Sequence, residues 1–176
     1  MKNTLQSLDG YVEASDTYDC VWILNEIKAI TLRFEGTRYI FLSLDDARTA
    51  YYAYSQPEHQ DLADYLKHFK SLVDVLEHYK ASIGEDPAFL DTAGVLLEEE
   101  EPDGSDPNLT AQWKARRVLA ARDRTLAIAF LKRAYKPKYG ALVTDLENQY
   151  TRGTDQYPND LTSAYNILLS YRQHCE

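Results

Sequence analysis

The sequence predicts an all-α protein, a helical bundle of about six or seven helices. Apolar residues recur at gaps of three and four along most of the chain, the spacing that places them on one face of a helix. The 176 residues include only 7 Gly and 6 Pro, few for a sheet-rich or disordered protein. The apolar fraction of 44% is enough for a sizeable core, in one domain or two small ones.

The clearest predicted helix lies within residues 56–84, QPEHQDLADYLKHFKSLVDVLEHYKASIG. Pro57 disfavours helical backbone at Gln56, so the helix must begin after it, and Gly84 is the predicted stop. One face is charged and the other is apolar, so we expect this helix to be the central strut of the domain and its apolar face to be core. That face comprises Leu62, Tyr65, Leu66, Phe69, Leu72, Val73, Leu76 and Tyr79.

Two further elements are predicted in the N-terminal part of the chain, within residues 1–15 and 17–34. Residues 1–15 are either a first helix or the frayed end of a piece of a longer polyprotein. Residues 17–34 form a helix that Asp16 is placed to cap. Its apolar residues follow a three-residue series, and a turn is predicted after it at residues 35–37. The series is Val21, Leu24, Ile27 and Ile30.

Residues 39–42, YIFL, are too short for a helix alone and have the length of a strand. No second strand is visible to pair with them, so we predict an extended connector. Ser43 and Asp46 then form a capping box that opens a helix over residues 44–55. The side chains expected to face inward from this helix are Ala47, Tyr51 and Tyr54.

A short helix and a linker are predicted after residue 84. The helix lies within DPAFLDTAGVLLEEEE, with Phe89, Leu90, Ala93 and Leu97 inward. Residues 98–107 contain two prolines, a glycine and mostly acids, a composition typical of a mobile linker.

Three helices are predicted after the linker. The first begins at Leu109 or Thr110, with Thr110 as the cap, and extends to about residue 135. Pro137 marks a break or the first turn of the next helix, which Gly153 ends. The last helix follows Pro158-Asn159-Asp160. Their inward residues are Trp113, Val118, Ala121, Leu126, Ala129 and Phe130, then Tyr139, Leu142, Val143, Leu146 and Tyr150, then Leu161, Ala164, Tyr165, Leu168 and Leu169.

Charge is negative overall but unevenly spread. The formal net charge is −9, which disfavours nucleic-acid binding by the whole surface. Residues 85–106 carry nine acids and no base, whereas residues 114–138 carry nine bases and one acid. We expect the two blocks to attract each other within the fold, and a nucleic-acid face on the basic block is the alternative.

No pattern for catalysis or metal binding occurs in the sequence. It lacks HExxH, GxSxG, a glycine-rich phosphate loop and a calcium loop. His68 and His78 are too far apart for a helical metal pair, and Cys20 and Cys175 form no CxxC pair. We therefore expect no enzyme, no cofactor, no metal and free thiols in the cytoplasm. No apolar run has the length of a membrane span, so no membrane partner is expected.

Gln56, Gln60, Tyr65 and Phe69, the last two within DYLKHFKSL, resemble the major homology region of Gag capsid proteins. The similarity is closest to copia-type (Pseudoviridae-like) LTR retrotransposons, and residues 130–171 resemble the end of the same capsid region. Together with FEGTRYIFLSLDDARTAYYAY these segments span most of the chain. Two departures occur: Pro57 stands where the motif usually has Gly, and Gln60 where it usually has Glu.

The resemblance implies a helical fold like that of retroviral and retrotransposon capsid domains. Residues 1–55 would be the tail of the N-terminal capsid domain, and residues 56–176 the C-terminal one with its linker at about 98–107. The implied function is a structural Gag protein that self-assembles into a virus-like particle around retrotransposon RNA. Its partners would be copies of itself, with RNA held only by segments outside this chain. The alternative is a domesticated Gag-derived or other helical adaptor that binds a protein or RNA.

Large amphipathic side chains are common in the last three helices, and such residues are enriched at the centres of protein interfaces. Capsid C-terminal domains commonly dimerise, which the resemblance carries over to this half of the chain. The sequence therefore predicts self-association there through Trp113, Tyr139, Tyr150, Tyr165 and Tyr171.

Overall fold

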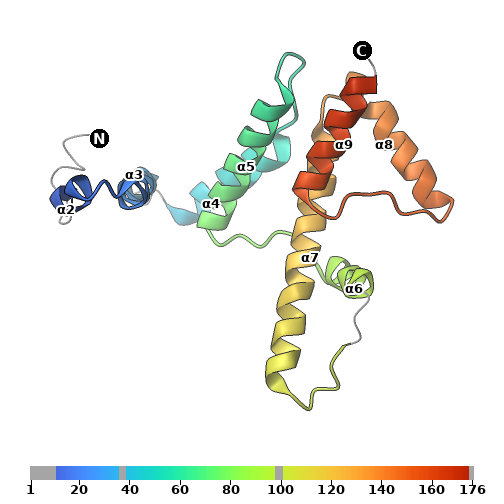
Figure 1. Ribbon diagram of the computed structural model, residues 1–176, viewed down its shortest axis with the longest axis horizontal. Coiled ribbons are helices and arrows are strands. Elements are labelled where there is room, and N and C mark those ends of the chain that lie inside the picture. Colours follow the sequence, from blue (N-terminus) through green and yellow to red (C-terminus); the bar gives the residue numbers. More distant parts are fainter. Residues whose placement is uncertain (1–10, 36–38, 98–100, 175–176) are drawn as a thin grey trace. The chain divides into compact units, whose positions relative to one another are not determined.

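The computed structural model describes residues 11–35, 39–97 and 101–174. All regular structure in these residues is helical (Figure 1), which confirms the all-α prediction. One helix has six residues, and the other seven have ten or more. The helices are α2 Tyr11–Asp16, α3 Cys20–Glu35, α4 Ile40–Ala53, α5 Leu62–His78, α6 Pro87–Leu96, α7 Pro107–Arg133, α8 Lys136–Thr151 and α9 Leu161–His174.

The chain divides into two compact units: unit 1 is Met1–Arg48 and unit 2 is Thr49–Glu176. The division lies inside α4, whereas the resemblance implied a boundary after Ser55. Tyr51 near the end of α4 and Tyr54 just after it thus belong to unit 2, where Tyr51 is buried and its ring lies 5.8 Å from that of Phe69.

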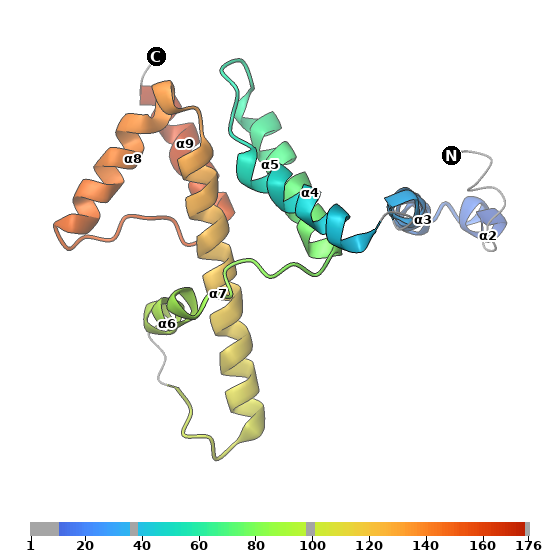
Figure 2. The same ribbon diagram turned by 180° about the vertical axis from the view of Figure 1, so that it is seen from behind.

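Unit 2 is organised around α7 and not around α5, which corrects the predicted central strut. Helices α6, α8 and α9 all contact α7 (Figures 1 and 2), while α5 contacts α9. A helix that is contacted on several faces carries apolar residues on each of them, so no single apolar stripe marks it in the sequence. The buried residues of α7 are Trp113, Ala121, Leu126, Ala127, Phe130 and Leu131.

Helix α5 buries the predicted face. Asp61 precedes it and accepts a hydrogen bond from the Ala63 amide at 3.0 Å, which caps its start. Three of the eight predicted apolar residues, Leu66, Leu72 and Tyr79, are half-buried at the edge of the stripe. The fully covered ones are Leu62, Tyr65, Phe69, Val73 and Leu76.

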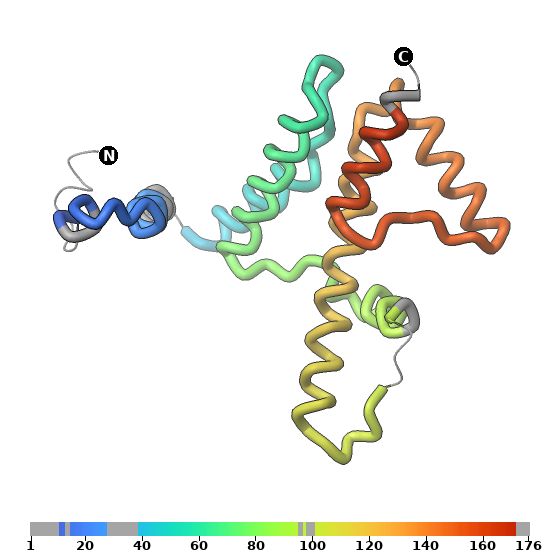
Figure 3. Tube along the Cα trace, viewed as in Figure 1, coloured from blue at the N-terminus to red at the C-terminus, as the bar shows by residue number. Residues whose placement is uncertain are grey.

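The predicted stop of α5 at Gly84 is wrong, because the helix ends at His78. Lys80 adopts a left-handed backbone with φ of 55°, and the Ala81 amide donates to the Leu76 carbonyl at 3.0 Å. This is the hydrogen-bond pattern of a Schellman motif, here with lysine in the usual glycine position. Gly84 lies further along the connection to α6, where that connection passes against α7 (Figure 3).

The structure replaces two predicted caps. Helix α3 begins at Cys20, and Asp19, rather than Asp16, accepts from the Trp22 amide at 2.9 Å. Helix α7 begins at Pro107, and the Asp106 carboxylate, rather than Thr110, accepts from the amides of the first turn. In both places two candidate caps stand within a few residues of each other, and their capping energies are similar.

Pro137 was predicted to mark either a break or the first turn of the next helix, and it lies in the first turn of α8. Gly153 follows its C-cap with φ of 88°, as predicted for the stop. The last helix begins after Asp160, whose carboxylate accepts from the Ser163 amide at 2.8 Å.

The 39–42 segment is not an extended connector, because α4 begins at Ile40. The Tyr39 carbonyl already accepts the amides of Leu42 and Ser43, so the helix starts earlier than predicted. Ser43 is therefore inside α4 and forms no capping box with Asp46. Its hydroxyl is buried and has no hydrogen-bond partner among the described residues. The predicted inward side of the helix holds, with Ala47 and Tyr51 buried.

Some predictions lie wholly or partly outside the described residues: the N-terminal part of 1–15, most of the turn at 35–37, and the start of the linker. Residues 101–106 form no helix, and the mobility of the linker stays a prediction. Helix α6 buries Ala93 as expected but leaves Phe89 exposed.

Candidate functional site

Gln56 and Gln60 lie in the connection between α4 and α5, and Gln56 ties this connection to the junction between α7 and α8. The backbone amide of Gln56 donates to the Arg133 carbonyl at 2.8 Å. The backbone amide of Tyr135, 79 residues away, donates to Gln56 Oε1 in the side chain at 3.0 Å. Gln56 Nε2 donates to the Gln60 carbonyl at 2.9 Å, and the Tyr54 hydroxyl donates to Gln60 Oε1 at 2.7 Å. Gln56 is buried, and both ends of its amide are satisfied.

Tyr65 and Phe69 continue this cluster into the core. The Tyr65 hydroxyl donates to the Phe130 carbonyl at 2.8 Å, and the two rings stack with centroids 4.5 Å apart. The Phe69 ring meets the Phe130 ring edge-on at 5.3 Å. Burial raises the pKa of the Tyr65 hydroxyl far above its ordinary value. We name Gln56, Gln60, Tyr65 and Phe69 with their partner Phe130 the motif cluster.

Stability should fall in alkaline solution because of Tyr65. Its pKa is raised in the folded state, so its contribution is fully present below the unfolded value of about 10 and is lost as pH rises above it. One such group makes the unfolding free energy fall by about 1.4 kcal/mol per pH unit. Urea unfolding from pH 8 to 11 should therefore show a shallower decline for Tyr65→Phe than for the parent. Tyr52→Phe, at an exposed ring, is the control. Equal slopes for Tyr65→Phe and the parent would contradict the expectation.

Arg133 of the basic block is held by unit 2 itself. Its Nη1 donates to the Tyr51 carbonyl at 2.6 Å, and its guanidinium lies 4.3 Å from the centroid of the Tyr51 ring. The Tyr52 ring lies at 5.6 Å. A guanidinium over an aromatic face is attracted by the ring quadrupole, so this arginine stabilises the end of α4 against α7.

Three further arginines of α7 are paired with acids. Arg117 pairs with Asp91, a contact between the basic and acidic blocks as predicted. Arg122 and Arg124 find their partners outside the acidic block, at Glu77 and Asp155 respectively. Such partly exposed pairs add little to stability. Their consequence is that these guanidinium groups are already occupied by carboxylates.

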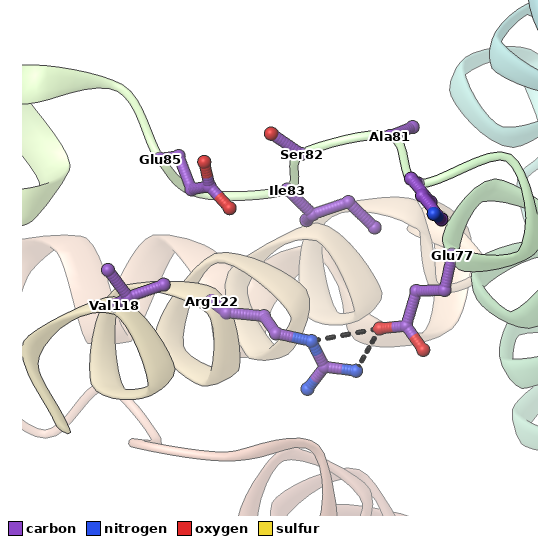
Figure 4. Close-up of a pocket in the computed structure, with 8 residues that line it drawn as sticks. Glu77, Ala81, Ser82, Ile83, Glu85, Val118 and Arg122 are labelled. Carbon is purple, nitrogen blue, oxygen red and sulfur yellow. Dashed lines mark hydrogen bonds and ion pairs between the residues drawn. The ribbon is translucent and has the colours of Figure 1, made fainter. Parts of the chain in front are cut away.

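The Arg122–Glu77 pair closes one end of a small hollow of about 250 Å³ between α7 and the connection from α5 to α6 (Figure 4). Arg122 Nε donates to Glu77 Oε1 at 2.9 Å, and Ile83 from the connection and Val118 from α7 also line the hollow. Because Arg122 already neutralises Glu77, we assign this hollow a structural role in holding the connection against α7.

We expect no tight RNA binding by this chain. The net charge is −9, and the paired arginines leave mainly lysines of the basic block in solvent. Fluorescence anisotropy at physiological salt should give a dissociation constant weaker than about 1 μM, in the range of non-specific binding. A tighter constant with a steep salt slope, reduced by Lys114→Glu, would show instead that the basic block is a phosphate-binding face.

A groove of about 820 Å³ runs between α6, α7 and α8, entirely within unit 2. Its lining combines apolar side chains, two exposed aromatic rings and five charged side chains, with Lys132 exposed on α7. The volume lies in the range of ligand and peptide sites. We name it the α6–α8 groove, and we call its half-buried apolar residues Ile128, Ala129 and Val143 the floor and its exposed rings Phe89 and Tyr150 the rim.

The five residues predicted for self-association differ in exposure. Trp113 and Tyr139 are buried in unit 2, as predicted from their inward positions on the helices, so their rings do not lie on its surface. Tyr165 and Tyr171 are half-buried, and the Tyr139 and Tyr171 rings lie 6.3 Å apart. Tyr150, predicted to face inward, is instead 60% exposed, and its ring lies 6.1 Å from that of Tyr157. The large rings of this small unit fill gaps between helices more than they cover its surface.

Sequence reasoning missed the most exposed apolar surface, which lies in unit 1. The side chains of residues 39–42 are between 55% and 70% exposed at the start of α4, and we name them the apolar segment. In the sequence, the signal was a run of four large apolar residues without a strand to pair with. Four more exposed apolar side chains lie in α2, α3 and the turn between them. They are Val12, Tyr18, Val21 and Leu24.

Within residues 11–35, 39–97 and 101–174, no group of His, Cys, Asp and Glu side chains is arranged to hold a metal ion. Over the same residues, no helix combines the length and apolarity needed to cross a membrane. Cys20 is a free, exposed thiol. Comparison of the chain with protein-family models, with curated proteins and with solved structures found no match.

Proposed function

We propose that this chain is the capsid region of a copia-type Gag protein and that copies of it assemble into a shell around retrotransposon RNA. The observation that carries the proposal is the motif cluster. Gln56 and Gln60 lie outside the apolar stripe of α5, so helical periodicity alone does not explain their position. Both nevertheless connect to Tyr65 through Tyr54: Gln56 bonds to the Gln60 carbonyl, the Tyr54 hydroxyl donates to Gln60 Oε1, and the Tyr54 ring lies 5.7 Å from the Tyr65 ring. The four residues that carry the resemblance therefore belong to one connected group of contacts, as the residues of a structural motif should.

The proposed function works through surfaces rather than reactive groups. Exposed apolar patches larger than a few hundred square ångströms are rare on monomers and mark contact sites. Unit 1 has eight large, exposed apolar side chains, while Ser43 and Ala47 are the only buried residues among those described there. Few of the side chains described in unit 1 are therefore buried and many apolar ones are exposed, which favours a role in association. In this proposal RNA is held by segments outside this chain.

Self-association is the direct test. Shell proteins build from many weak, repeated contacts, so we expect a dissociation constant in the micromolar range, about −8 kcal/mol. Analytical ultracentrifugation from low micromolar to near millimolar concentration should show a rising average mass. Circular dichroism at the same concentrations is the control that the helices persist. A strict monomer over the whole range, with its helices intact, would overturn the proposal. Electron microscopy of a longer polypeptide then tests for particles.

The α6–α8 groove favours a second candidate function, a helical adaptor that binds a partner protein. A concave apolar floor with aromatic rims suits an amphipathic helix or an apolar peptide. The two functions differ in the ultracentrifuge, because an adaptor stays monomeric without its partner.

A further inference from the structure

We infer that copies of this chain associate head to tail, with the apolar segment of one copy seated in the α6–α8 groove of the next. The inference rests on the proposed self-assembly and names the contact that produces it. Two exposed apolar features that differ in shape carry it: one projects from a helix end and the other is hollow.

The apolar segment needs a concave partner. Tyr39 directly precedes α4 and the other three residues form its first turn, in which successive residues are rotated by about 100°. The side chains therefore encircle the helix, and a flat surface would cover only part of them. Tyr39 and Phe41 alone, each 70% exposed, leave on the order of 250 Å² in water, since a whole aromatic side chain buries 150–250 Å².

The groove needs a convex partner. Ile128, Ala129 and Val143 form its floor, and the exposed rings of Phe89 and Tyr150 stand at its rim. Two copies of a hollow cannot fill each other, so a symmetric groove-to-groove contact would leave the floor uncovered. The apolar segment is a convex feature of the same chain with matching chemistry.

Charge favours one orientation of the segment in the groove. Of the charged residues that line the groove, Arg124 and Asp155 pair with each other and Arg133 donates to the Tyr51 carbonyl. The other two are Lys132 on α7 and Glu147 on α8. Asp45 is exposed about one turn after the segment. Complementary charges select register and orientation at an interface. The Asp45 side of α4 should therefore face the α7 wall, where it meets Lys132.

This contact is heterologous, because each copy uses one segment and one groove. A heterologous contact leaves a free segment at one end of the complex and a free groove at the other. It therefore generates rings or open assemblies instead of stopping at a dimer. Growth beyond the dimer is the property that a shell requires.

Complementation between two variants tests the inference. The segment variant carries Ile40→Asp and Phe41→Asp, and the groove variant carries Phe89→Asp and Tyr150→Asp; all four side chains are exposed, so the fold should persist. Each variant alone should associate at least about 30-fold more weakly than the parent, the loss typical of an interface hot spot. An equimolar mixture should form a 1:1 complex that does not grow, because one intact segment and one intact groove remain. Sedimentation velocity distinguishes this complex from monomers and from the growing parent.

Two matched controls place the same charge on similarly exposed side chains outside both features: Val21→Asp in unit 1 and Leu119→Asp on α7. Both should associate like the parent. The charge pair is tested by Lys132→Glu, which should weaken association, and by adding Asp45→Lys, which should restore it.

The outcomes separate this inference from the proposed function. If the parent associates but the mixed variants stay monomeric, the head-to-tail contact is wrong and self-assembly uses another surface. If the parent itself is monomeric, both fail. A photocrosslinker at position 41, in a mixture of isotopically labelled and unlabelled copies, should join α7 or α8 of a different copy. Crosslinks only within one copy would show that the segment occupies its own groove and would overturn the inference.

Discussion

Replacing Phe69 with alanine is expected to lower the free energy of unfolding by about 3–5 kcal/mol. Phe69 is completely buried, and its ring lies 5.8 Å from Tyr51, 6.3 Å from Tyr65 and 5.3 Å from Phe130. These partners come from α4, α5 and α7, so the cavity would open where three helices meet. A small domain has a stability of about 5–15 kcal/mol, so the variant should lose much of it.

Chemical denaturation followed by circular dichroism measures this loss. Phe89→Ala is the matched control, because it removes the same ring from a side chain that is 47% exposed on α6. That control should lose less than about 1 kcal/mol, since little buried area disappears with it. A melting temperature of Phe69→Ala within a couple of degrees of the parent would contradict the place of this ring in the core.

Replacing Gly84 with alanine is expected to destabilise the protein by about 2–5 kcal/mol. Two costs add up: a backbone term, the strain of a side chain on a left-handed backbone, and a contact term, the clash of the new Cβ atom with its neighbours. The backbone has φ of 76°, which an L side chain rarely adopts. A Cβ atom here would lie 2.8 Å from Thr125 Oγ1, 2.9 Å from the Ala121 carbonyl oxygen and 3.0 Å from Arg122 Cα. Two of these atoms are backbone, so the connection from α5 to α6 must move away from α7.

Gly104→Ala separates the two terms. Gly104 has nearly the same backbone, φ of 82°, but a Cβ atom there would meet nothing within 4 Å. This control should lose only the backbone term, about 1–2 kcal/mol at most. If the two variants lose the same unfolding free energy, the connection does not pack against α7 as the structure has it.

Helix positions could largely be predicted from the sequence because helical hydrogen bonds are local and an apolar face leaves a three- and four-residue period. Helix α5 is the clearest case, since it packs with one face and shows one stripe. Helix α7 packs with several faces, so its central role left no single stripe in the sequence. The 39–42 segment had the apolar density of a buried strand. Its helical start became visible only with the backbone of α4.

The candidate site could be predicted in part. The residues of the motif cluster were named from the sequence, but their partners were not. The Tyr135 amide is 79 residues from Gln56, and nothing local to either residue indicates the pairing. The same holds for the aromatic residues: whether Trp113 is buried and Tyr150 exposed depends on which helices cover them.

By itself the sequence determined the helical class of this protein, the inward face of α5 and the glycine that follows α8. Each of these follows from the order of side chains along a few turns. Only the tertiary structure decided that Lys80 ends α5, that Gly84 lies against α7, and that the apolar segment and the α6–α8 groove are both left uncovered. Those outcomes depend on contacts between residues far apart in the chain. The spacing of apolar residues within one helix does not indicate which other segments pack against it.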